Sequence, residues 1–155
     1  MKTFEEIKEE LLQRAKERNA CQTGYKMGLE AQSKQDLLKV ITENWLWVLG
    51  TAKIVDARYL EENFTEEELT EASIYTQKCH VVRTASFACG SATVKAYDSA
   101  TVKAYGSATV EAYNNSYVED CIGNIRPQSD YAIVKDYFNH KIYIKKGRFE
   151  IVEVE

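Results

Sequence analysis

The sequence of 155 residues is poor in proline and histidine and has no paired cysteines, and each shortage excludes a class of protein. A single proline, Pro127, argues against a long disordered segment. The two histidines, His80 and His140, lie in no catalytic motif. The four cysteines lack CxxC spacing, which indicates free thiols in a reducing compartment rather than a disulfide framework. They are Cys21, Cys79, Cys89 and Cys121.

The sequence also lacks an excess of positive charge and a long apolar run. Its net charge of -4 provides no global basic field of the kind that attracts nucleic acids or anionic membranes. No apolar run approaches the roughly 18 residues that a membrane span requires. The first residues, Met1 to Glu6, are charged and contain no apolar signal segment. We therefore expect a cytoplasmic protein that does not enter a membrane.

No catalytic signature is present. There is no phosphate-binding loop and no dinucleotide fingerprint. A zinc site built from Cys79, His80, Cys89 and Cys121 would match the spacing of no known finger or ribbon. A Cys–His hydrolase would need a third group to position the histidine, and neither histidine has a recognisable partner. The sequence predicts a protein that is not an enzyme and has no catalytic residue, metal ion or cofactor.

The first half of the chain has the patterns of short amphipathic helices. Thr3 and Glu6 form a capping box that opens a helix from Phe4 to Arg18. Ser33 opens a strongly apolar helix whose stripe ends at Gly50. Shorter helical or turn segments are predicted at 24–31, 54–62 and 66–72. We therefore predict a helical N-terminal region over residues 1–75.

After residue 75 the pattern changes to β-branched and aromatic residues that alternate with period two, and one eight-residue sequence, the octad, is repeated. The copies are SATVKAYD, SATVKAYG and SATVEAYN, which begin at Ser91, Ser99 and Ser107. Because the period is even, strand alternation stays in phase from copy to copy. One face then carries alanine and valine. The opposite face carries Thr93, Lys95, Tyr97, Thr101, Lys103, Tyr105, Thr109, Glu111 and Tyr113.

Two folds are compatible with short strands of this length. An antiparallel meander would place apolar and polar residues on the same face of neighbouring strands. A right-handed β-solenoid stacks each residue on its equivalent one coil later and keeps the two faces separate. We predict an α+β fold, in which a β-solenoid over residues 76–155 is capped by the helical region. Coils of two octads or of three octads both fit, and the small inward residues favour the narrower form.

The octad phase extends beyond the obvious copies. Cys89, Cys121 and Tyr137 fall on the tyrosine positions, and GNIRPQSD from Gly123 keeps the length as an irregular rung. Ile142 and Ile144 are predicted to continue the inward columns. A closing strand is predicted from Phe149 to Val154. Open coil ends invite aggregation, so we expect the helices around Trp45–Leu49 to cover the first coil and the closing strand or a dimer partner to cover the last.

Four segments resemble a group of small proteins. They are NACQTGYK (Asn19–Lys26), ENWLWVLG (Glu43–Gly50), YLEENFTEEELTEASIY (Tyr59–Tyr75) and the SATVKAY octads. Together they resemble small uncharacterised proteins of gut bacteria and their phages or mobile elements, in which a helical N-terminal region precedes SATVxAY repeats. The resemblance implies a cytosolic accessory protein. It transfers no catalytic or binding residue.

The outward face of the octads is the candidate binding surface. Its threonine, lysine and tyrosine columns are suited to recognising a protein, a glycan or stacked bases, although stacked identical side chains also stabilise solenoids by themselves. We expect a non-enzymatic protein-interaction module that forms homo-oligomers, a phage or mobile-element protein acting on a host or viral partner. The alternative is a nucleic-acid role, either direct binding through Lys95, Lys103 and the lysines after residue 134 or mimicry of duplex DNA.

Overall fold

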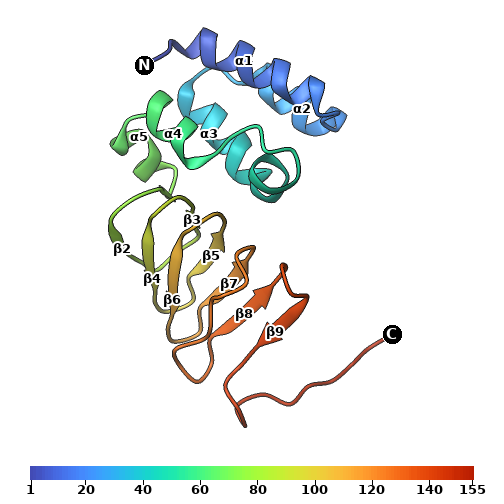
Figure 1. The fold of residues 1–155 in the computed structure, drawn as a ribbon, viewed down its shortest axis with the longest axis vertical. Coiled ribbons are helices and arrows are strands. Elements are labelled where there is room, and N and C mark those ends of the chain that lie inside the picture. Colours follow the sequence, from blue (N-terminus) through green and yellow to red (C-terminus); the bar gives the residue numbers. More distant parts are fainter. The chain divides into compact units, whose positions relative to one another are not determined.

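The structure is a computed structural model that describes all residues from Met1 to Glu155. The chain divides into two compact units, Met1–Ile74 and Tyr75–Glu155. The first unit is helical and the second is a β-solenoid, so the fold is α+β (Figure 1). No helix is long and apolar enough to cross a membrane.

The helical unit contains five short α-helices and one π-helical turn. The predicted capping box at Thr3 with Glu6 is present, and a second capping box forms at Thr65 with Glu68. The inward faces of these helices bury residues such as Ile7, Leu38 and Leu60. The elements are α1 (Phe4–Glu17), α2 (Gln22–Glu30), α3 (Lys34–Glu43), the π-helical turn η1 (Leu46–Thr51), α4 (Ala57–Asn63) and α5 (Glu66–Glu71).

The predicted continuous helix from Ser33 to Gly50 is wrong, because it breaks at Asn44. The side-chain amide of Asn44 donates a hydrogen bond of 2.8 Å to the Val40 carbonyl, and the Asn44 backbone N–H donates to the same oxygen. Asparagine competes in this way with the backbone hydrogen bonds of a helix. The α-helix ends there, and the chain continues as η1.

The second unit has nine short strands in two sheets. One sheet has the strand order β1-β3-β5-β7-β8-β9, and the other has the order β2-β4-β6. We call them the six-stranded and the three-stranded sheet. The strands are β1 (Ile74–Tyr75), β2 (Cys79–Val82), β3 (Ser86–Ala88), β4 (Thr93–Ala96), β5 (Thr101–Ala104), β6 (Thr109–Ala112), β7 (Tyr117–Asp120), β8 (Ile133–Asp136) and β9 (Lys141–Tyr143).

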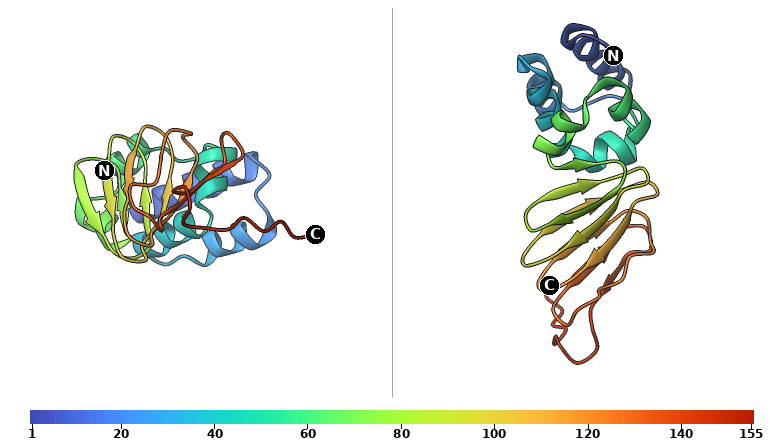
Figure 2. Two further views of the ribbon diagram at one scale, coloured as in Figure 1. Left: turned by 90° about the horizontal axis from the view of Figure 1, so that it is seen from below. Right: turned by 90° about the vertical axis from the view of Figure 1, so that its left-hand side faces the viewer.

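The register of these strands sets the size of the coil. Thr93 pairs in parallel with Thr109, and Thr101 pairs with Tyr117, so each coil contains two octads. Consecutive octads therefore lie on opposite sheets, and parallel strands stack along the solenoid (Figure 2). The predicted solenoid is confirmed, with the narrower of the two coil sizes considered.

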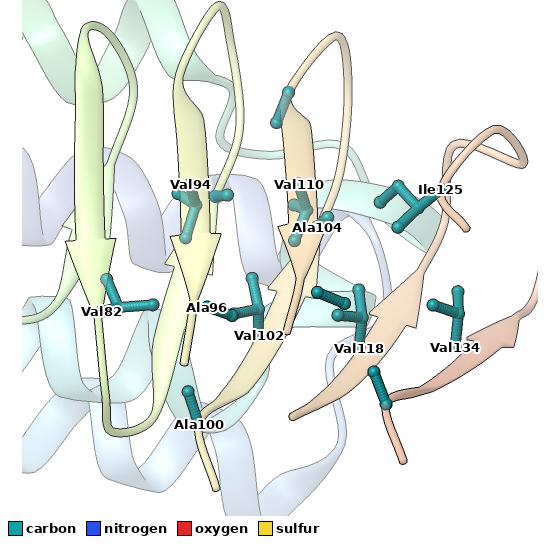
Figure 3. Packing of buried hydrophobic residues seen from close by; sticks show 14 residues of the cluster. Val82, Val94, Ala96, Ala100, Val102, Ala104, Val110, Val118, Ile125 and Val134 are labelled. Carbon is teal, nitrogen blue, oxygen red and sulfur yellow. The ribbon is translucent and has the colours of Figure 1, made fainter. Parts of the chain in front are cut away.

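The interior contains the alanine and valine columns that the even period predicts. Val102, Val118 and Val134 lie in one column of the six-stranded sheet, and all three are fully buried (Figure 3). Val94 and Val110 face them from the three-stranded sheet. This narrow interior, filled by alanine and valine, explains why no large aromatic residue occupies an inward position of the repeats.

The last residue of each octad turns the chain from one sheet to the other. Gly90, Asp98, Gly106 and Asn114 all have positive φ angles, between 51° and 74°. This left-handed conformation costs glycine little, and aspartate and asparagine tolerate it better than other residues. The last residue of the octad is therefore Gly, Asp or Asn because the backbone there is left-handed.

The segment Gly123–Asp130 forms the predicted irregular rung. Its Pro127 makes an isolated parallel bridge to Ala112, and Ile125 fills the interior in place of a strand valine. The Gln128 N–H donates to the Ala112 carbonyl at 2.8 Å, which keeps the rung attached to β6. The coil length is kept although the strand is lost, since Tyr117 pairs with Ile133 at the same spacing as Thr101 with Tyr117.

Two predictions for the end of the solenoid are wrong. β9 pairs antiparallel with β8 in a register that puts Tyr143 opposite the inward Val134 and Ile142 opposite the outward Lys135, so Tyr143 packs against the interior while Ile142 is 63% exposed. Ile144 lies outside any strand. The predicted closing strand is also absent, because residues 149–155 form no strand and all their side chains are exposed.

Candidate interaction surfaces

The eight predicted binding residues do not form one surface. Because consecutive octads lie on opposite sheets, the proposed tyrosine column divides into two. The three-stranded sheet carries Thr93, Lys95, Tyr97, Thr109 and Tyr113. The six-stranded sheet carries Thr101, Lys103 and Tyr105.

On the three-stranded sheet the tyrosines stack on each other. The rings of Tyr97 and Tyr113 are nearly parallel, with centroids 4.8 Å apart. The guanidinium of Arg83 lies 5.5 Å from the centre of the Tyr97 ring and also pairs with Asp98 at 2.8 Å. The Tyr113 hydroxyl donates to Glu111 at 2.8 Å, and this hydrogen bond raises the pKa of Tyr113. These side chains connect neighbouring coils to one another.

The two candidate nucleic-acid-binding lysines are both paired with glutamates of the next coil. Lys95 Nζ lies 3.7 Å from a carboxylate oxygen of Glu111, and Lys103 Nζ lies at the same distance from Glu119. Partly exposed pairs of this kind contribute only up to about 1 kcal/mol each. Because each lysine lies beside a glutamate, neither sheet has a continuous basic stripe.

On the six-stranded sheet, cysteines alternate with tyrosines in the column that was predicted from the octad phase. The backbone ladder places Cys89, Tyr105, Cys121 and Tyr137 in successive coils. Cys89 is buried. Burial raises the pKa of Cys121 to about 11, and the neighbouring carboxylates of Asp120, Glu119 and Asp136 act in the same direction. Because the thiol stays protonated at neutral pH, Cys121 is a poor nucleophile.

Two buried aspartates were missed by the sequence reasoning. Asp120 and Asp136 occupy the inward position of Ala104 one coil and two coils later, respectively. Asp120 accepts hydrogen bonds from the backbone N–H groups of Ile122, Gly123 and Ile125 at 2.7 to 3.0 Å. The signal was present in the sequence, since YVED and IVKD end in aspartate where the other octads have alanine.

The remaining chemistry-bearing residues do not assemble into a site. The His80 Nε2 lies 2.8 Å from the Gln77 carbonyl oxygen, and its ring lies 4.3 Å from that of Tyr75. Cys79 is exposed. No group of three or more histidine, cysteine, aspartate or glutamate side chains is arranged to hold a metal ion.

Exposed apolar side chains gather instead in the last part of the solenoid unit. β9 is the edge strand of the six-stranded sheet, and the segment from Phe149 onward runs away from it (Figure 1). The root of this segment is held by Arg148, which pairs with Asp130 at 2.9 Å, and by an edge contact between Phe149 and Tyr131. The exposed apolar residues are Phe138, Ile142, Phe149, Ile151, Val152 and Val154.

Comparison of the chain with protein-family models, with curated proteins and with solved structures gave no match.

Proposed function

We propose that the protein is a non-enzymatic protein-interaction module that self-associates, and that the contact is made at the β9 edge. The observation that carries this proposal is an open strand edge beside an exposed, extended apolar segment of the same chain. An unpaired edge presents backbone N–H and C=O groups that readily pair with another strand. We call residues 149–155 the apolar segment.

The occupant that fits this edge is the apolar segment of a second copy. Residues 141–148 contain four basic side chains and no acidic one, whereas the apolar segment contains three glutamates and no basic residue. Opposite charges on paired strands stabilise the pairing, and like charges oppose it. Reciprocal addition of each segment to the other copy's β9 would also give a closed, symmetric dimer.

The repeat faces give less support for binding a partner. The tyrosines of the three-stranded sheet are stacked on each other, and Lys95 and Lys103 are engaged with glutamates. These contacts favour the structural interpretation of the octad columns, in which repeated side chains join one coil to the next. Direct nucleic-acid binding through the two lysines is therefore not part of the proposal.

The test is the mass of the protein in solution, measured by light scattering across a concentration series. The wild-type chain is expected to form a dimer, and Val152→Pro is expected to be monomeric because proline removes a backbone donor from the pairing strand. The control is Val81→Lys, which alters another exposed apolar side chain and should leave the dimer intact. Lysine is used at this position because proline would disrupt strand β2.

Charge reversal makes the test specific to the pairing. Glu150→Lys with Glu153→Lys should weaken the dimer, and adding Lys145→Glu with Lys146→Glu should restore it. A wild-type protein that stays monomeric at high concentration, or variants that keep the wild-type mass, would overturn the proposal.

A further inference from the structure

The helical unit contains an apolar cavity that the solenoid and its proposed contact do not use. It has a volume of about 280 Å³, opens to solvent, and lies between α1, α2, α3 and η1. Aliphatic and aromatic side chains form most of its wall, among them Leu11, Leu12, Val40, Ile41, Trp47 and Val48. An apolar cavity of about 150 Å³ is large enough to bind benzene. This one is nearly twice as large.

The sequence of α2 keeps side chains out of this space. Gly24 and Gly28 are four residues apart in a nine-residue helix, so both lie on the same face, and both line the cavity. A methyl group at Gly28 would lie 3.1 Å from Leu12, which is tighter than an ordinary contact. A methyl group at Gly24 would meet Asn44 and Cys21 at 3.4 to 3.5 Å, an ordinary contact distance. Glycine disfavours a helix, so two of them facing one cavity indicate a packing or functional need.

The opposite wall is the π-helical turn. η1 positions Trp47 and Val48 at the cavity, and the Ala52 N–H closes the wide turn by bonding to the Trp47 carbonyl at 2.7 Å. π-Helical turns are rare and frequently occur at functional sites. The cavity is therefore bounded by a glycine helix on one side and by a widened helical turn on the other.

Three of the polar side chains at the cavity, Lys8, Asn44 and Cys21, are already engaged. Lys8 Nζ donates to the carbonyls of Leu29 and Ala31 at 2.7 and 2.6 Å. The Asn44 amide donates to Val40, and the Cys21 thiol accepts from the Gly24 N–H. Lys8 is the only charged residue of the lining, and no carboxylate is present. This environment would penalise a charged ligand and accept a neutral one.

We infer that this cavity is a binding site for an uncharged, apolar small molecule, such as an alkyl or aromatic compound with at most one hydrogen-bonding group. Binding sites for small molecules are typically concave, mostly apolar and largely formed in advance, and the cavity has each of these properties. The ligand would bury its surface against α2 and η1, next to the indole of Trp47.

The experiment uses N-phenyl-1-naphthylamine, a neutral fluorescent probe, with the 155-residue chain carrying Val152→Pro so that self-association does not contribute. The probe is expected to gain fluorescence on binding, to receive energy from Trp47, and to be displaced by decanol. The Trp47→Phe variant should lose the larger part of the energy transfer, which would place the probe beside η1.

Two leucine substitutions in the same helix supply the decisive comparison. Gly24→Leu puts a side chain into the cavity and should weaken probe affinity at least tenfold. Thr23→Leu adds the same side chain at an exposed position that does not line the cavity, and should leave the affinity unchanged. Far-UV circular dichroism checks that both variants are folded.

No fluorescence gain with the wild-type cavity would overturn the inference. Equal affinities in folded Gly24→Leu and Thr23→Leu would do the same, because the probe would then lie elsewhere, for example on the exposed apolar residues near β9. If Gly24→Leu does not fold, Val40→Phe fills the cavity from α3, and retained affinity in that variant would contradict the assignment.

Discussion

The two buried aspartates, Asp120 and Asp136, depart most clearly from the octad repeat, because they are polar residues at an inward position. Each replaces an inward alanine, and each is held by hydrogen bonds that leave no carboxylate oxygen without a donor: three backbone N–H groups for Asp120, and the backbone and side-chain N–H groups of Asn139 for Asp136. Buried carboxylates are tolerated when they are hydrogen-bonded in this way. The two carboxylates therefore stabilise the turns that follow β7 and β8, where the octad sequence is lost.

The first prediction concerns the pH dependence of stability at Asp136. Burial raises the pKa of this carboxyl group, but the hydrogen bonds from Asn139 and from the Phe138 backbone outweigh burial, so its pKa lies below the ordinary value of 3.8. Because the pKa is lower in the folded state, the ionised carboxylate stabilises the fold above about pH 4, and this contribution is lost as the pH falls through the folded-state pKa. The free energy of unfolding of Asp136→Asn should therefore approach that of the wild type between pH 4 and pH 2.

Urea unfolding followed by circular dichroism at pH 6, 4, 3 and 2 measures this difference. Glu61→Gln, which changes an exposed carboxylate outside the proposed contact, should track the wild type at every pH. A gap between wild type and Asp136→Asn that stays constant down to pH 2 would show that the charge of Asp136 does not contribute.

At the scale of single elements, the strands are joined by columns of side chains with the spacing of the coil. The pairing of Thr93 with Thr109 places every second octad on the same sheet, so Tyr97 meets Tyr113 and not Tyr105. Stacking should therefore couple tyrosines that lie one coil apart, and not tyrosines that lie one octad apart.

A double-mutant cycle tests this expectation. Replacing Tyr97 and Tyr113 by alanine, singly and together, should give a coupling energy of about 0.5 to 1.5 kcal/mol, as found for stacked aromatic pairs. The same cycle with Tyr97 and Tyr105 should give a coupling near zero, because these residues lie on opposite sheets. Equal coupling in the two cycles would contradict the observed register.

Local signals predicted most elements, and the failures have local causes. The capping boxes at Thr3 and Thr65 and the alternation of the octads are encoded in adjacent residues, so both were visible in the sequence. The register of β9 was not visible, because an Ile-Tyr-Ile run can turn either its isoleucines or its tyrosine inward. The cavity was also hidden, since Gly24 and Gly28 weakened the helix prediction without indicating which neighbours they face.

At the scale of the whole molecule, the even period of the repeat fixes which residues face inward, but it does not fix the number of octads in a coil. An even period requires only that inward residues stay inward, and coils of two or three octads satisfy it equally. The choice of two depends on how many small side chains fill the interior, which is a property of the assembled coil. The sequence therefore predicted a solenoid but placed Tyr105 on the same surface as Tyr97.

Insertion of octads tests the coil at this scale. A second copy of Ser91–Gly106 placed after Gly106 adds one complete coil, and every later residue keeps its sheet. This variant should melt at or above the wild-type temperature, because repeat proteins gain an interface with each added unit. Insertion of Ser99–Gly106 alone moves all later strands to the opposite sheet and puts a copy of Lys103 beside Lys95, in the position of Glu111. Like charges on neighbouring strands are destabilising, so this variant should melt roughly 5 °C lower. Equal melting temperatures measured by circular dichroism would contradict this account.

The two-octad coil also has a consequence for the gene. Tandem repeats in DNA lengthen and shorten by slippage during replication, and a slip by one repeat would add or remove one octad. A single slip would leave the interior intact and yet exchange the two outer surfaces from that point onward, so the β9 edge would follow the other sheet. Two slips would restore every surface. We therefore expect natural length variants of such a gene to differ by even numbers of octads.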